Sequence, residues 1–94
     1  MLKNNEYFDG NVMSIAFTTG KGAATVGVMI PGEYEFGTST IEYMTIVSGN
    51  MAVMLPDNTE WTVYSPFETF IVAKNRKFKI QVKGEDCAYL CLYR

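Results

Sequence analysis

The chain has 94 residues, of which 48% are hydrophobic, and this length and composition predict one globular domain over residues 1–94. A formal net charge of −2 gives no indication of the basic face that nucleic-acid-binding proteins normally carry, so we expect no nucleic-acid partner. No segment reaches the ~18 apolar residues of a membrane span, and the N-terminus lacks the apolar core of a signal peptide. We therefore expect no membrane partner and a cytoplasmic location.

Period-two alternation of side chains runs through most of the chain and predicts β-strands. In chain order the residues that share a strand face are Met13, Ile15 and Phe17; Val26, Val28 and Ile30; Tyr34 and Phe36; Phe78, Ile80 and Val82; and Tyr89, Cys91 and Tyr93. Turn-forming residues separate these runs at 20–22, 31–32, 49–50, 56–58, 65–66 and 83–84. Many short, evenly spaced strands are typical of a β-sandwich or barrel.

The two cysteines, Cys87 and Cys91, lie in one expected strand. Four residues of extended chain separate their α-carbons by roughly 13 Å, whereas a disulfide needs them within about 7 Å. The sequence therefore predicts two free, partly buried thiols.

A turn at Pro31-Gly32 is followed by a carboxylate, Glu42, and by a strand that ends at Gly49. This frame resembles the first motif of the cupin barrels. In a metal-binding cupin the ligands fall near Thr38, Thr40, Glu42 and Phe70, but this chain contains no histidine. One carboxylate and two hydroxyls are poor ligands for first-row metals, which favour imidazole and thiolate donors. We expect no metal and no other cofactor.

Several sequence blocks follow one another in a fixed order. They are Tyr7-Phe8-Asp9-Gly10 with Val12 and Ser14; Thr25-Val26-Gly27-Val28-Met29; Pro31-Gly32-Glu33-Tyr34-Glu35-Phe36-Gly37-Thr38; Glu42 and Met44; Leu55-Pro56 with Trp61; Asn75 with Phe78; and Tyr89, Cys91 and Tyr93. With these blocks the chain resembles the pyrimidine/purine nucleoside phosphorylase family of small single-domain cupins over essentially its whole length. The resemblance implies an all-β fold, with one cupin domain built as a double-stranded β-helix or jelly-roll barrel.

The same resemblance implies an enzyme of broad base specificity. Its substrates are a nucleoside and inorganic phosphate, and its products are the free base and a pentose 1-phosphate. The chain departs from the family in one turn region: a glycine is usual near Phe67, and Val-Pro-Ala-Asn is usual where this chain has Ala73 and Lys74 before Asn75, followed by Arg76. Two other functions stay open, a non-catalytic cupin that binds a nucleoside or sugar and a structural interaction module.

Glu42 is the candidate catalytic residue. Strand alternation predicts that its side chain shares the inner face of the barrel with Thr38, Thr40 and Met44. A carboxylate among apolar neighbours is costly unless it has a role or a partner, and the alternative is a structural hydrogen bond to the backbone. We expect Thr38 and Thr40 to bind substrate, with Thr38 also a phosphate ligand; the alternative for Thr38 is a strand-end hydroxyl that only satisfies the backbone. Met44 is expected to form an adaptable wall, and its alternative is plain core filling.

Aromatic side chains are the candidates for contact with the base, because base–aromatic stacking tolerates different bases. The candidates are Tyr7, Trp61, Phe70, Tyr89 and Tyr93, of which we select Phe70, Tyr89 and Tyr93 as substrate-binding residues. In so small a domain most aromatic residues belong to the core, so fewer than half of the candidates should touch substrate. Arg76 and Lys77 are candidate phosphate ligands at the barrel mouth, or else part of a solvated strand entry.

We also expect a homodimer, because a small barrel has exposed sheet edges that natural proteins cover. The aromatic segment Tyr7-Phe8 lies outside the main alternating runs. This segment is therefore the expected contact between subunits.

Overall fold

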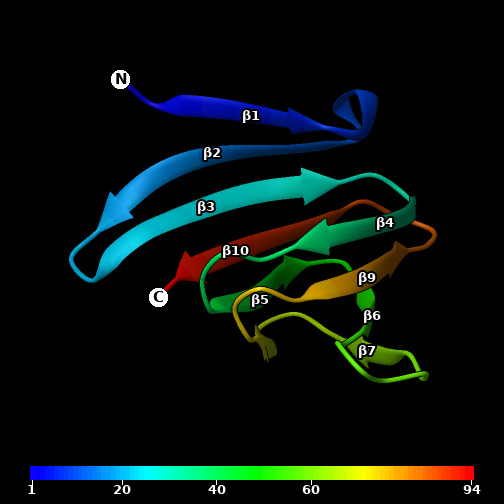
Figure 1. Cartoon of the computed structure of the whole chain (residues 1–94). Helices are drawn as coiled ribbons and strands as arrows, with labels where there is room; N and C mark the ends of the chain where they lie inside the picture. The colour runs from blue at the N-terminus through cyan, green and yellow to red at the C-terminus, as the bar shows by residue number, and fades with distance from the viewer.

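The chain folds into two antiparallel β-sheets that face each other across the core, and the computed structural model describes all residues 1–94 (Figure 1). The only helical element is a single 3₁₀ turn, η1 (Phe8–Gly10). The predicted all-β class is therefore confirmed. No helix has the length and apolar character that crossing a membrane requires.

The larger sheet has six strands and the smaller has four. In spatial order the larger sheet contains β1 (Lys3–Tyr7), β2 (Val12–Thr19), β3 (Gly22–Met29), β10 (Cys87–Tyr93), β5 (Glu42–Ser48) and β8 (Thr69–Val72). The smaller contains β4 (Gly32–Gly37), β9 (Lys77–Val82), β6 (Met51–Met54) and β7 (Thr62–Tyr64). Neither sheet closes on itself, since β1 and β8 are the edges of one and β4 and β7 the edges of the other. All six predicted turns lie between strands.

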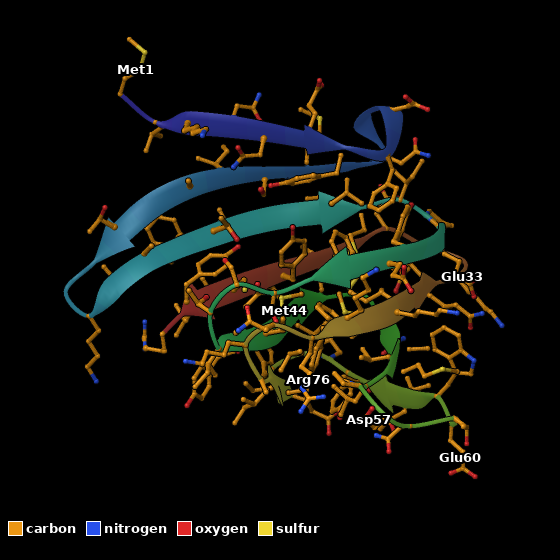
Figure 2. The ribbon with its side chains drawn as sticks, in the orientation of Figure 1. Met1, Glu33, Met44, Asp57, Glu60 and Arg76 are labelled. Carbon is orange, nitrogen blue, oxygen red and sulfur yellow. The ribbon has the colours of Figure 1, made fainter.

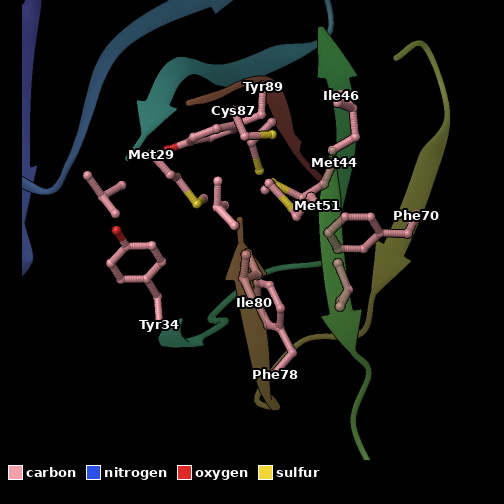
Figure 3. Packing of buried hydrophobic residues seen from close by; sticks show 14 of the residues in the cluster. Met29, Tyr34, Met44, Ile46, Met51, Phe70, Phe78, Ile80, Cys87 and Tyr89 are labelled. Carbon is pink, nitrogen blue, oxygen red and sulfur yellow. The ribbon is translucent and has the colours of Figure 1, made fainter. Parts of the chain in front are cut away.

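Side chains from the inner faces of both sheets form a core cluster of 15 buried residues. Figure 3 shows methionine and aromatic side chains meeting there, with Met44, Met51 and Phe70 near one another. Burial of such side chains stabilises the fold by about 1.5–3 kcal/mol each. Phe78 and Ile80 share the buried face of β9, and Cys87 and Cys91 are buried on β10. Both cysteines are free, which confirms that prediction.

The strand pattern was wrong at two places. Thr38 and Thr40 lie in the loop between β4, which ends at Gly37, and β5, which begins at Glu42. Strand parity therefore does not extend from Glu42 back to the threonines.

The segment Lys3–Tyr7 is not outside the sheet but is the edge strand β1, paired with β2. Its sequence gave no alternation because this strand has no buried residue on either face.

Phe8 packs within its own chain. Its ring centroid lies 5.1 Å from that of Tyr34 and 5.5 Å from that of Phe36. Phe8 and Asp9 both have positive φ angles, of 53° and 58°, a conformation that non-glycine residues rarely adopt. The aromatic contacts hold this strained turn over the end of β4 beside the candidate site.

Candidate active site

A cavity of about 220 Å³ lies between the two sheets. Its lining comes from both sheets: Tyr7, Ser14, Met29, Phe36, Gly37, Glu42, Met44, Phe78, Tyr89, Cys91 and Tyr93. Tyr7, Phe36 and Gly37 retain solvent exposure and form the rim, whereas Met29, Met44 and Phe78 are buried and form an apolar floor.

Strand geometry gathers the polar side chains on one wall of the cavity. Tyr89, Cys91 and Tyr93 are alternate residues of β10, so all three face inward. Glu42 lies directly opposite Tyr93 on the neighbouring strand β5. Ser14 adds a hydroxyl from β2. This wall therefore offers hydroxyl, thiol and carboxyl groups, and the cavity contains no lysine or arginine.

Glu42 is the only Asp, Glu, Lys or Arg residue among those that line the cavity. Burial raises the pKa of its carboxyl above the ordinary value, and a hydrogen bond from Cys91 partly offsets that increase. The Cys91 thiol donates to Oε1 of Glu42 over 3.5 Å. The other carboxylate oxygen, Oε2, makes no hydrogen bond within the protein, and it is not fully buried. One oxygen is thus held by the protein while the other remains free for a ligand.

The neighbouring groups are held neutral. Burial, followed by the charge of Glu42, raises the pKa of Cys91 to about 12. Burial is also the main reason that the pKa of Tyr89 rises to about 12 and that the pKa of Tyr93 rises further. The Tyr93 hydroxyl shares a 3.0 Å hydrogen bond with the Thr25 hydroxyl on β3. These side chains can therefore donate hydrogen bonds at neutral pH.

Tyr89 owes its position to the absence of a side chain opposite it. Gly27 on β3 is the register partner of Tyr89, and a Cβ atom on Gly27 would lie 2.5 Å from Oη of Tyr89 and 2.6 Å from Cζ. The ring therefore lies directly over the glycine. A glycine in a strand often marks such a close approach.

Four of the nine residues selected from the sequence line this cavity: Glu42, Met44, Tyr89 and Tyr93. Tyr7, a wider aromatic candidate, lies at the rim, whereas Trp61 does not line the cavity. Phe70 is a core residue, with its ring centroid 4.9 Å from that of Tyr64. Ser14, Phe36 and Cys91 line the cavity but were not predicted from the sequence. Cys91 could have been found, because it shares strand parity with Tyr89 and Tyr93.

The threonines do not line the cavity. The Thr38 hydroxyl donates to the Ala73 carbonyl at 2.7 Å and accepts from the Arg76 backbone N–H at 3.1 Å. It therefore joins the end of β4 to the turn at 73–76. The Thr40 Oγ1 atom is buried without a hydrogen-bond partner.

The two predicted cationic ligands lie outside the cavity. Arg76 extends toward Asp57, with 3.5 Å between Nη1 and Oδ2 (Figure 2). Lys77 is exposed at the start of β9.

The residues at the cupin ligand positions do not fit a metal. The Thr38 hydroxyl is already bonded to backbone, and Phe70 packs in the core. Of the four cupin ligand positions, only that of Glu42 lines the cavity. No three His, Cys, Asp or Glu side chains are grouped closely enough to hold a metal ion.

Comparison with known proteins gives a consistent family match. The model of the pyrimidine/purine nucleoside phosphorylase family matches residues 2–93. A protein of that name from Pseudomonas syringae is 55% identical over 94 residues, which cover 100% of both chains.

Among solved structures, a protein of unknown function from Vibrio parahaemolyticus is 45% identical, with a TM-score of 0.92 over 97% of this chain and 96% of its own. The polyketide cyclase RemF from Streptomyces resistomycificus is only 14% identical, covers 96% of this chain and 71% of its own, and has a TM-score of 0.74. This last likeness concerns the fold alone, and it supports the cupin-like architecture.

Proposed function

Because the chain belongs to the pyrimidine/purine nucleoside phosphorylase family, we propose that it catalyses the phosphorolysis of purine and pyrimidine nucleosides in the cavity that contains Glu42. An identity of 55% over the full length of a relative that carries this name supports the assignment of activity. The observation that carries the assignment of the site is the free Oε2 atom of a half-buried carboxylate on a wall of neutral donors.

The proposed reaction exchanges one bond at the anomeric carbon. An oxygen of inorganic phosphate gives an electron pair to C1′, and the C1′–N bond pair leaves with the base, which takes up a proton. The products are the free base and a pentose 1-phosphate. Positive charge develops on the sugar as the C1′–N bond breaks, so a nearby anion stabilises the transition state more than the ground state.

We propose that the pentose binds against the polar wall and that the Glu42 carboxylate contacts the pentose. Ionised carboxylate oxygens only accept hydrogen bonds, so they suit ribose hydroxyls rather than phosphate. The Tyr89 and Tyr93 hydroxyls can donate or accept and complete the wall. In this arrangement Glu42 both orients the pentose and stabilises its developing positive charge.

The base belongs at the rim in this proposal. The cavity, at about 220 Å³, is smaller than the roughly 300–1,000 Å³ of sites that enclose a drug-sized ligand. It therefore suits part of the substrate, while the exposed ring of Tyr7 and the half-buried ring of Phe36 offer faces for the base. Stacking does not discriminate strongly between bases, which agrees with a broad range of substrates.

Phosphate binding by Thr38, Arg76 and Lys77 stays a prediction. It is supported by the position of the backbone. Thr38 follows the rim residue Gly37, and the Thr38 N–H donates to the Arg76 carbonyl at 2.9 Å, so both residues lie close to the mouth of the cavity. Arg76 would have to leave Asp57, and that exposed ion pair is weak. Lys77 would act by attracting the anion to the mouth.

We further propose that turnover needs no metal ion, because the donor set around Glu42 is poor in metal ligands. Exhaustive treatment with EDTA should leave the rate unchanged. Loss of activity that one defined metal restores would overturn this part of the proposal.

A homodimer is also proposed, with the outer face of the larger sheet as the contact with a second copy. Met13, Ile15, Val26, Val28 and Val47 point outward from β2, β3 and β5 and are 38–46% exposed. With Ala88 they line a shallow apolar hollow of about 560 Å³. Contiguous exposed apolar surface of this kind marks interaction sites, and one patch that pairs with itself gives a two-fold dimer.

The family resemblance also leads to proposals on the barrel architecture, the domain bounds and the cellular location. We propose that the two sheets together are the double-stranded β-helix of a cupin jelly-roll barrel, that residues 1–94 are one domain, and that the protein is cytoplasmic. The cytoplasmic location is supported by two free thiols, since disulfides are rare in that compartment.

The experiment that tests the function is the incubation of uridine, adenosine and inosine with the purified protein, with and without inorganic phosphate. Release of base together with pentose 1-phosphate, only when phosphate is present, is the expected result. Release without phosphate would indicate hydrolysis instead. Binding of nucleosides without release of base would indicate a binding protein.

A further inference from the structure

Four polar side chains form two diagonal hydrogen bonds, side by side, on the inner face of three adjacent strands. Thr25 of β3 lies opposite Cys91 of β10, and Glu42 of β5 lies opposite Tyr93 of β10. The hydrogen bonds run diagonally, from Thr25 to Tyr93 at 3.0 Å and from Cys91 to Glu42 at 3.5 Å. Diagonal neighbours across an antiparallel pair are within reach of long side chains.

Cys91 is well placed to fix the orientation of Glu42. Its side chain is buried, with 1% exposure, and it lies on the middle strand of the three, directly hydrogen-bonded to β5. A thiol is compact and donates a single hydrogen bond. Engagement of Oε1 by that donor leaves the carboxylate only one free oxygen and removes much of its rotational freedom.

We infer that Cys91 is a positioning residue for the proposed phosphorolysis: it holds the Glu42 carboxylate in the rotamer that presents Oε2 to the pentose. This inference rests on the proposed function for its effect on rate, but the hydrogen bond itself can be tested without activity. Positioning matters because misplacement of a catalytic group by 1 Å can cost 10²-fold in rate.

The chemistry of the pair suits this role. Because burial raises the pKa of Cys91 to about 12, the thiol stays protonated and remains a donor throughout the neutral range. The ionisable groups that face Glu42 are Cys91, Tyr93 and Tyr89, all on β10. On its other side Glu42 pairs with Val72 of β8, which cannot ionise. The thiol is thus the one donor that engages the carboxylate.

A double-mutant cycle tests the inference through activity. Cys91→Ala removes the donor, and we expect turnover to fall by roughly 3- to 10-fold with a smaller change in KM, while Cys91→Ser restores a donor and most of the rate. In a Glu42→Gln background Cys91→Ala should have no further effect. Cys87→Ala is the matched control, since Cys87 is equally buried on β10 but does not line the cavity.

A second measurement does not depend on turnover. The pKa of the Glu42 carboxyl, followed by carbon NMR, should rise in Cys91→Ala because the carboxylate loses its donor, and should return toward the wild-type value in Cys91→Ser. It should not move in Cys87→Ala. If this pattern holds in a protein without phosphorylase activity, the proposed function fails while the Cys91–Glu42 interaction stands.

Two results would overturn the inference. One is an unchanged Glu42 pKa in a folded Cys91→Ala variant. The other is a loss of activity in Cys91→Ala that is fully additive with Glu42→Gln, because Cys91 would then act independently of the carboxylate.

Discussion

The hydroxyl end of Tyr89 packs against Gly27, so that a single Cβ atom on the glycine would come within 2.5 Å of the tyrosine hydroxyl oxygen. The two residues are register partners on β10 and β3. A glycine in the middle of a strand therefore decides where one wall of the proposed active site stands.

This contact predicts the effect of Gly27→Ala. The added methyl group also meets the Met13 carbonyl at 2.7 Å, so relief requires movement of the tyrosine or of the sheet. We expect a loss of roughly 1–3 kcal/mol in the free energy of unfolding and weaker substrate binding. Gly20→Ala is the control, because no atom lies within 4 Å of its new Cβ. Thermal unfolding that is equal for both variants would contradict the close approach.

A strained turn predicts a stabilising substitution. Phe67 has a φ angle of 72° and is 82% exposed, and the Glu68 N–H donates to the Ser65 carbonyl at 3.0 Å across the turn. Phe67→Gly should relieve a backbone cost of about 1–2 kcal/mol, reduced by the greater entropy of unfolded glycine. A net gain of roughly 0.5–1 kcal/mol would raise Tm by ~2–8 °C. Phe67→Ala keeps the Cβ, and an equal gain in that variant would exclude strain as the cause.

The apolar outer face predicts an oligomer that one charge disrupts. Val28→Glu places a carboxylate in the middle of the proposed contact, where its desolvation is costly. We expect the wild type to sediment as a dimer at micromolar concentration and Val28→Glu as a monomer. Val63→Glu, the same change at a 61% exposed valine of the smaller sheet, should remain dimeric. A monomeric wild type would refute the dimer.

The raised pKa of Glu42 predicts how stability depends on pH. The folded state binds a proton at Glu42 more tightly than the unfolded state does, so this residue adds stability at low pH and loses it as pH rises through the folded pKa. Relative to Glu42→Gln, the wild type should therefore gain thermal stability as the pH falls from 7.5 toward the unfolded value of about 4.3. Differential scanning calorimetry of both proteins across that range measures the difference. A relative gain with rising pH would mean that the carboxylate is stabilised by folding.

Strand parity predicted the parts of the site that lie within continuous strands. Tyr89 and Tyr93 line the cavity because β10 is extended from Cys87 to Tyr93, and Met44 shares the inner face of β5 with Glu42. Parity failed for Thr38 because the chain leaves the sheet between Gly37 and Glu42. Side chains alternate between two faces only within a continuous strand, so the alternation does not extend across such a loop.

The direction of each sheet face could not be read from the sequence of β2 and β3. Met13 and Ile15 share a face as expected, but that face points outward, and the inner face carries Val12 and Ser14. An apolar residue is compatible with either a core or a subunit contact. A serine is likewise compatible with a surface position, yet Ser14 is buried and lines the cavity.

Glu42 is the central residue of the proposed active site, and the rate of pentose 1-phosphate formation by Glu42→Gln tests its role. The amide keeps the shape but removes the charge, so we predict a ~100- to 1,000-fold lower turnover in a folded protein. Glu35→Gln, at an exposed glutamate of β4, should keep the wild-type rate. Wild-type turnover per folded molecule of Glu42→Gln would contradict the account, because Glu42 would then be a structural residue of the wall.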